Sequence, residues 1–117
     1  MKNIQELNKI IRQLLKELGC SANLLGYEYL VSALFLCATS SKNILPMGTI
    51  YDVVAKKCDT TYSKAERSIR HAIETSILKA NPDKFNEVFG WTVDSNKGKP
   101  TNSEYIFTVA DYIKNFY

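Results

Sequence analysis

Residues 46–79, PMGTIYDVVAKKCDTTYSKAERSIRHAIETSILK, decide the fold that the sequence predicts. Proline is tolerated in a first helical turn, so a helix is expected to begin near Pro46 and to end around Lys57. Its apolar side carries Met47, Ile50, Tyr51 and Val54. A turn follows at residues 59–61, and a second helix is expected from Ser63 to Lys79. Two helices separated by so few residues predict a helix-turn-helix unit at about residues 46–79.

The predicted helix at 63–79 has two distinct faces when its residues are placed at about 100° intervals. One face is apolar or small and contains Ala65, Ile69, Ala72, Ile73 and Ser76. The opposite face is polar and mostly basic, with Ser63, Lys64, Arg67, Arg70, His71 and Glu74. Alanine at two positions of the apolar face allows close packing on the preceding helix. The pattern therefore predicts a firmly packed helix with a long exposed basic face.

Helical spacing and capping residues continue outward in both directions from this unit. A first helix is expected from Ile4 to Leu18 and a second from Tyr27 to Thr39, the latter apolar on most sides and therefore the most buried element. Asn81 and Pro82 are typical of the start of a short helix that ends at Gly90.

A polar loop at 94–100 precedes Thr101 and Glu104, whose spacing predicts a capping box for a last helix. That helix places Ile106, Val109, Ala110, Ile113 and Phe116 on one face. Strand signals are nearly absent. We expect one all-α domain over residues 1–117, a compact bundle of about six helices containing a helix-turn-helix, of the winged-helix-like, response-regulator effector class.

Composition excludes several classes of protein. The chain has 117 residues, 45% of them hydrophobic and 23% charged, which is typical of a globular chain of one domain. Lys2, Glu6 and Lys9 interrupt any signal-peptide core, and the apolar stretch at 30–38 is far shorter than the about 20 residues of a membrane-spanning helix. Location in the cytoplasm, with no membrane partner, is therefore expected.

The few thiol and imidazole groups give no sign of a metal site or a catalytic site. Cys20, Cys37 and Cys58 are widely and unevenly spaced, which favours buried free thiols over a disulfide framework. His71 is the one histidine of the chain, and no carboxylate pair or activated nucleophile stands out. We expect no metal, no other cofactor and no enzymatic activity.

The distribution of charge suggests a nucleic-acid partner more strongly than its total does. The chain has a formal net charge of +3, which is only mildly basic. Between residues 56 and 70 there are five basic residues, Lys56, Lys57, Lys64, Arg67 and Arg70, against two acidic ones, Asp59 and Glu66. A helix fits the major groove of B-DNA, and the first turns of a recognition helix meet the base edges there.

Lys64, Glu66 and Arg67 occupy those first turns and are the predicted base-reading residues. Arginine can donate two parallel hydrogen bonds to guanine, glutamate can accept one from cytosine, and lysine can donate to guanine, so a GC-containing element suits them. Charged residues on an exposed helix face also occur for solvation alone. From spacing alone, these two interpretations stand about even.

Two further groups of residues are weighed in the same way. Residues 97–103, with Lys97, Lys99, Thr101, Asn102 and Ser103, combine ammonium groups with a helix N-terminus and could bind phosphate. On spacing alone, a solvated loop and a cap are favoured there. The apolar cluster Phe85, Val88, Phe89 and Trp91 is interpreted as core, with part of it able to lie at the surface.

Particular residue strings resemble a known family. Residues 66–74, ERSIRHAIE, and 97–104, KGKPTNSE, closely resemble the DNA-binding effector domain of the sporulation master response regulator, the stage zero sporulation protein A family of endospore-forming bacteria. The resemblance runs from about Ile4 to Ile113, with short matches in order at Leu18-Gly19, Gly26-Tyr27, Tyr29-Leu30, Ala55-Lys56-Lys57, Thr60-Thr61 and Phe89-Gly90.

The resemblance implies a six-helix domain that binds a short GC-containing promoter element and regulates transcription in sporulation. It implies that Glu66 and Arg67 read bases and that Lys64 stands where the family usually has arginine. It also makes Lys99, Thr101 and Asn102 expected phosphate contacts, beside Ser63, Arg70 and His71 as backbone-positioning residues of the helix. Further implied partners are the RNA polymerase sigma subunit, through the diverged segment matching residues 81–93, and a second copy in a homodimer on DNA.

Members of that family normally carry an amino-terminal receiver domain, and these residues contain no acidic phosphoacceptor pocket or βα alternation. The chain is interpreted either as an excised effector domain or as a stand-alone relative. A rival hypothesis is a protein-interaction module that keeps the fold and pairs with a full-length relative or with polymerase. Two features of the sequence support this rival: lysine at position 64, where the family usually has arginine, and the modest net charge of the chain.

Overall fold

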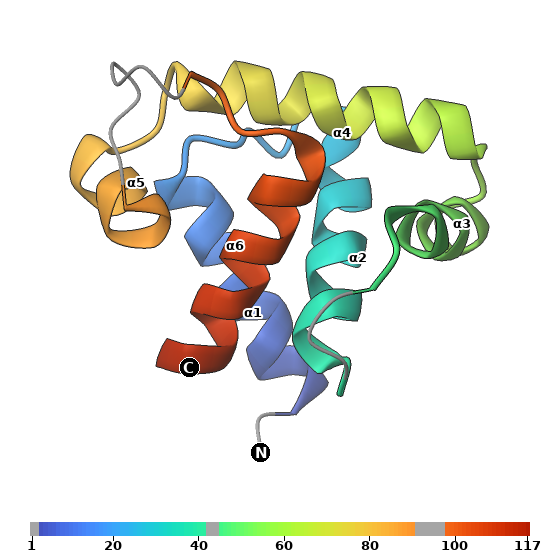
Figure 1. The fold of residues 1–117 in the computed structure, drawn as a ribbon, viewed down its shortest axis with the longest axis horizontal. Coiled ribbons are helices and arrows are strands. Elements are labelled where there is room, and N and C mark those ends of the chain that lie inside the picture. The colour runs from blue at the N-terminus through green and yellow to red at the C-terminus, as the bar shows by residue number, and fades with distance from the viewer. Residues whose placement is uncertain (1–2, 42–44, 91–97) are drawn as a thin grey trace.

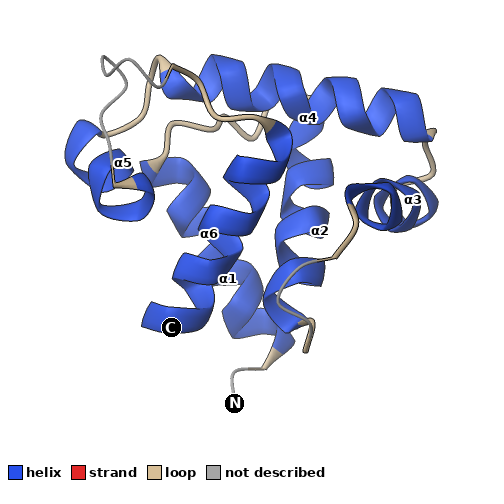
Figure 2. Ribbon diagram, in the orientation of Figure 1, coloured by secondary structure: helices blue, strands red, loops and turns tan. Residues whose placement is uncertain are grey.

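The computed structural model describes residues 3–41, 45–90 and 98–117, and this part of the chain forms six helices (Figure 1). They are α1 (Ile4–Glu17), α2 (Gly26–Thr39), α3 (Met47–Lys57), α4 (Tyr62–Ile77), α5 (Pro82–Phe89) and α6 (Asn102–Phe116). Within the described ranges there is no strand (Figure 2). The predicted all-α fold with a helix-turn-helix, here α3 and α4, is confirmed.

The arrangement places α4 across one end of the molecule (Figure 1). Helices α2 and α6 run below α4 and pack on each other, and α2 also contacts α1, α3 and α4. Eight of the 14 residues of α2 are buried. The prediction that this helix is the central, most buried element is therefore confirmed, and its position supports the underside of α4.

Local capping accounts for most helix boundaries. Asn81 Oδ1 accepts a hydrogen bond from the Lys84 amide at 3.0 Å, and Gly90 ends α5 with a left-handed φ of 80°. Thr101 and Glu104 form the predicted capping box, with Thr101 N donating to Glu104 Oε1 at 2.9 Å and Glu104 N donating to Thr101 Oγ1 at 3.2 Å. These local predictions are confirmed, and each depends on residues no more than four positions apart in the chain.

Several helix boundaries differ from the expected ones by one or two residues; α4, for example, ends at Ile77 and not at Lys79. Helix α4 begins at Tyr62, one residue early, because the Thr61 hydroxyl caps it by accepting from the Lys64 amide at 3.1 Å. Helix α3 begins after Pro46, whose ψ of 138° is extended. Neither of the two shifted starts changes which side chains of α3 and α4 face each other.

Most predicted core positions are buried; Ile10 and Met47 are half-buried, and the positions at the outer ends of the bundle are exposed. On the apolar face of α1, Leu7, Ile11, Leu14 and Leu15 are buried and Ile10 is half-buried, but Ile4 is 68% exposed, and Phe116 at the end of α6 is 72% exposed. The apolar cluster of α5, Phe85, Val88 and Phe89, is core as expected, whereas Trp91 lies outside the described residues.

The three cysteines are free thiols, as predicted. Cys20 and Cys37 are buried and Cys58 is half-buried. None of the helices in the described ranges is both long and apolar enough to span a bilayer.

A buried tyrosine gives a test of the core. Tyr105 is 1% exposed, and within the described ranges its Oη forms no hydrogen bond of good geometry; the nearby Ser76 hydroxyl instead donates to the Ile73 carbonyl at 2.8 Å. Burial raises the pKa of Tyr105, so the phenol stays neutral. Because an unpaired buried hydroxyl is costly, Tyr105→Phe is expected to leave the free energy of unfolding unchanged or to raise it by up to about 1 kcal/mol.

Urea denaturation of the two proteins measures this difference. Tyr51→Phe is the matched control, because the Tyr51 hydroxyl accepts a hydrogen bond from Asn102 at 2.8 Å. That variant is expected to lose about 1 kcal/mol. A clear loss of stability in Tyr105→Phe would contradict the view that its hydroxyl is unpaired.

Candidate nucleic-acid interface

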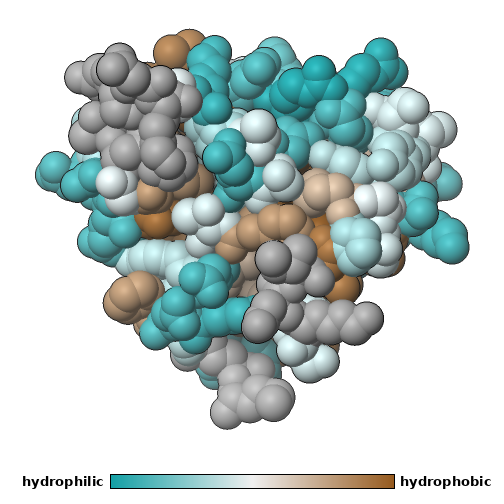
Figure 3. Space-filling model, viewed as in Figure 1, coloured by the Kyte–Doolittle hydropathy of each residue, from teal (hydrophilic) through white to brown (hydrophobic). Residues whose placement is uncertain are grey.

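Helix α4 has the two faces that its sequence predicts. Its buried residues are Ala65, Ile69, Ala72, Ile73, Ser76 and Ile77, which face the bundle. The predicted outward residues Ser63, Lys64, Arg67, Arg70, His71 and Glu74 are all exposed. In the space-filling view, hydrophilic residues gather along the edge where α4 runs (Figure 3). The basic face of α4 is thus accessible along its length.

Two glycines, Gly19 in the segment joining α1 and α2 and Gly26 at the start of α2, allow the backbone to lie directly against α4. A Cβ atom built on Gly26 would lie 2.1 Å from the Ser68 carbonyl oxygen, in the middle of α4. One built on Gly19, whose φ is +82°, would lie 2.5 Å from the Ser76 carbonyl oxygen near the other end. Such distances leave no room for a side chain. Helix α4 is therefore held by direct backbone contact at two separate points.

One flank of α4 carries Lys64, Arg67 and His71, which line a shallow groove together with Leu25 and Gly26. The Arg67 Nε donates to the Ser63 carbonyl at 3.4 Å, so this side chain is directed toward the start of the helix. In the described part of the chain, no carboxylate forms an ion pair with Lys64 or Arg67. These two cations are thus available to an external anion or acceptor.

The opposite flank carries Glu66 and Arg70, which form an ion pair one turn apart. The Glu66 side chain is 29% exposed and that of Arg70 is 51% exposed. The Glu66 carboxylate raises the pKa of Arg70. Both side chains line a groove that is closed on its far side by residues 99–103. Glu66 and Lys64 therefore lie on opposite edges of the exposed face, with Arg67 between them.

The start of α6 lies against this second flank. Lys99 is exposed, and the Thr101 hydroxyl accepts from Glu104 N as the helix cap. Asn102 Nδ2 donates to Tyr51 Oη at 2.8 Å and to the Glu66 carbonyl at 3.1 Å. The structure thus brings the residues expected to contact phosphate next to the predicted base-reading residues. Lys97 lies outside the described residues.

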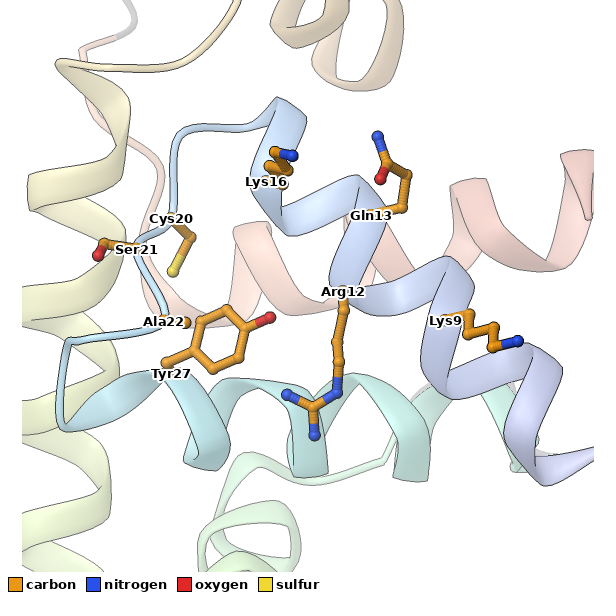
Figure 4. Close-up of a pocket in the computed structure, with 8 residues that line it drawn as sticks. All are labelled: Lys9, Arg12, Gln13, Lys16, Cys20, Ser21, Ala22 and Tyr27. Carbon is orange, nitrogen blue, oxygen red and sulfur yellow. The ribbon is translucent and has the colours of Figure 1, made fainter.

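A further hollow runs along α1, with Lys9, Arg12 and Lys16 on its rim and Cys20 and Tyr27 among its lining (Figure 4). Arg12 donates to both carboxylate oxygens of Glu28, at 2.8 and 3.0 Å, which lowers the pKa of Glu28. Burial raises the pKa of Cys20 to about 11, so its thiol is protonated and a poor nucleophile at neutral pH. The residues described around this hollow therefore do not form a catalytic site with Cys20 as its nucleophile.

Metal-ligating side chains do not gather elsewhere in the described ranges, where no three His, Cys, Asp or Glu residues could hold an ion together.

Sequence reasoning missed three features of this face. These are the backbone approach of Gly26 to α4, the exposure of Leu25 beside Arg67, and the hydrogen bonds of Asn102 to α3 and α4. The residues that form these contacts lie far apart in the chain, so the local spacing of residues cannot predict the contacts. The pair Gly26-Tyr27, which is part of the family resemblance, is the sequence feature that points to a special role for Gly26.

Comparison with known families agrees with this geometry. The family described as sporulation initiation factor Spo0A C terminal matches residues 11–113, which include all of α2 to α5, half of α1 and most of α6. The members of that family are DNA-binding regulatory domains of sporulation initiation. The chain therefore belongs to the family of the sporulation initiation factor Spo0A C-terminal domain.

Proposed function

We propose that the chain is a sequence-specific regulator of transcription that inserts α4 into the major groove of a short GC-containing promoter element. The observation that carries this proposal is the exposed basic face of α4, held on the bundle by backbone contacts at Gly19 and Gly26. A helix so held presents its side chains in a fixed arrangement, as base reading requires.

Three residues of α4 are assigned to base edges. Arg67 lies at the centre of the face and has no acidic partner among the described residues, so its guanidinium can take guanine O6 and N7 as a bidentate donor. Glu66 can accept from cytosine N4, and Lys64 can donate to guanine from the other edge of the face. Lysine donates as a point charge where arginine would use a fork, which lowers its discrimination.

Six residues are assigned to the sugar-phosphate backbone. Ser63, Arg70 and His71 flank the base-reading residues on the exposed face of α4. Lys99 supplies an ammonium group, Thr101 caps α6, and Asn102 is the first residue of that helix, where the main-chain N–H groups of a first turn favour an anion. For Asn102 the main-chain N–H is the proposed donor, because its side-chain amide is bonded inside the protein.

The main partner implied by this proposal is double-stranded DNA, which the protein would meet in the cytoplasm. We extend the proposal to a homodimer on DNA and to the RNA polymerase sigma subunit, for which α5 is the candidate contact. Helix α5 turns Phe85, Val88 and Phe89 inward and leaves Asp83, Asn86 and Glu87 exposed. Those polar side chains form the surface that a partner would meet.

Fluorescence anisotropy with labelled duplexes at two salt concentrations tests the proposal. Duplexes selected from a random pool should bind more tightly than unrelated duplexes, and the affinity should fall steeply with salt because phosphate contacts release counterions. Lys99→Ala should weaken binding to all duplexes alike and make the salt dependence shallower by about one phosphate contact.

The rival hypothesis predicts a different result in the same assay. Binding that is undetectable, or that does not change with salt, would favour a protein-interaction module that pairs with a relative or with polymerase. A magnesium-supplemented nuclease assay on the same duplexes serves as the check on enzymatic activity, and intact duplex is expected.

A further inference from the structure

The side chain of Asn102 joins three helices at one point. Asn102 is the first residue of α6, and its amide donates to Tyr51 Oη of α3 at 2.8 Å and to the Glu66 carbonyl of α4 at 3.1 Å. A side-chain amide has two hydrogens to donate, so these two bonds use both. We call this set of bonds the Asn102 clasp.

The clasp acts on the backbone of α4 at a residue assigned to base reading. A helical carbonyl has two lone pairs, of which the helix itself uses one, so the Glu66 carbonyl can accept the Asn102 amide as well. A bond to one carbonyl on the side of a helix opposes rotation of the helix about its axis. Side chains that recognise a ligand must be held to within about 0.5 Å and 10–20°. Rotation of α4 is therefore the motion that base reading tolerates least.

Tyr51 supports the clasp from α3. It is 6% exposed, and its ring packs edge-on against Tyr62, the first residue of α4, with 5.1 Å between ring centroids. Tyr51 thus touches the start of α4 with its ring and, through Asn102, reaches the helix again at Glu66. The two helices of the helix-turn-helix are therefore joined by a residue that lies 51 positions beyond Tyr51 and 36 positions beyond Glu66 in the chain.

We propose that Asn102 and Tyr51 are positioning residues for base recognition, which set the rotation of α4 on the bundle and thereby determine sequence specificity. This inference rests on the proposed function, since it assumes that α4 reads bases. It assigns the Asn102 side chain to the interior of the protein, with the phosphate contact made by the main chain of α6.

The test compares two affinities for each variant, one for the preferred duplex and one for a duplex with a single exchanged base pair. Asn102→Ala and Tyr51→Phe are each expected to reduce the ratio of the two affinities about three- to tenfold, with little change in binding to unrelated DNA. The double variant should be no worse than Asn102→Ala alone, because both changes break the same set of bonds. Lys99→Ala is the control: it should weaken binding to both duplexes by the same factor, so the ratio of the two affinities should not change.

The alternative is that the Asn102 side chain contacts phosphate directly. In that case Asn102→Ala would weaken both duplexes equally and Tyr51→Phe would change neither, and this result would overturn the inference. NMR of the free protein keeps this test separate from the proposed function. The Asn102 amide protons should be slow to exchange and lie near the Tyr51 ring, whether or not the wild type discriminates between duplexes.

Discussion

Replacing Gly26 by alanine is expected to lower the free energy of unfolding by about 3 kcal/mol, because the new methyl group would overlap the backbone of α4. The Cβ atom would lie 2.1 Å from the Ser68 carbonyl oxygen and 2.6 Å from its carbon. Main-chain atoms in the middle of a helix cannot rotate away as the end of a flexible side chain can. The two helices must therefore separate, and α4 must move on the bundle.

Displacement of α4 should also affect recognition of DNA. Specific binding by Gly26→Ala is expected to be lost, while weak binding to unrelated DNA persists, since the basic residues stay on the surface. Urea denaturation measures the stability, and anisotropy with two duplexes measures the discrimination. NMR chemical shifts at Ser68 and Ile69 report the displacement in the folded fraction.

Gly48→Ala is the matched control for this substitution. A Cβ atom on Gly48 would lie 3.8 Å from the Tyr62 hydroxyl, an ordinary contact, and Gly48 lies in the first turn of α3. Alanine is the better helix former, so this variant is expected to keep the wild-type stability or to gain up to about 0.5 kcal/mol. Equal stability of Gly26→Ala and the wild type would mean that the close approach of α2 to α4 is not required.

The Arg67→Ala variant is expected to lose about 1–3 kcal/mol of binding free energy at the preferred duplex and to lose discrimination at one base pair. Arg67 is the central cation of the exposed face and pairs with no carboxylate among the described residues. Its removal therefore takes away a contact to DNA without leaving a buried charge unpaired. The fold should be unaffected, because the side chain is exposed.

Two control variants separate base reading from simple charge. Arg67→Lys keeps the positive charge but lacks the planar fork, so it should retain the salt dependence while losing most of the discrimination. Lys9→Ala removes one positive charge from α1, away from α4, and should leave discrimination intact. If Arg67→Ala weakened every duplex by the same factor, Arg67 would be a phosphate contact and the base assignment would be wrong.

Local features of this fold could be predicted from the sequence. The capping box of Thr101 and Glu104, the Asn81 cap and the Gly90 end of α5 each depend on a few neighbouring residues, and the two faces of α4 follow from helical spacing. The early start of α4 was missed because Thr61 was assigned to the turn, although threonine is a common helix cap.

Contacts between distant segments could not be predicted in this way. Gly26 has an ordinary helical backbone, so nothing nearby in the sequence explains why a side chain is excluded there; the reason is Ser68. Asn102 was expected to contact phosphate because it starts a helix beside Lys99, but its amide is bonded to Tyr51 and Glu66. Only the packing of α6 against α3 and α4 brings these groups together.

The two backbone contacts at Gly19 and Gly26 have a consequence for how new specificities can arise. They depend on main-chain atoms of α4, and the side chains that face outward take no part in them. Lys64, Arg67 and His71 can therefore be exchanged for other residues while the placement of the helix stays the same. A lineage of such proteins, or a designed library, can diversify the operators that it recognises by changing a handful of codons in a scaffold that stays constant.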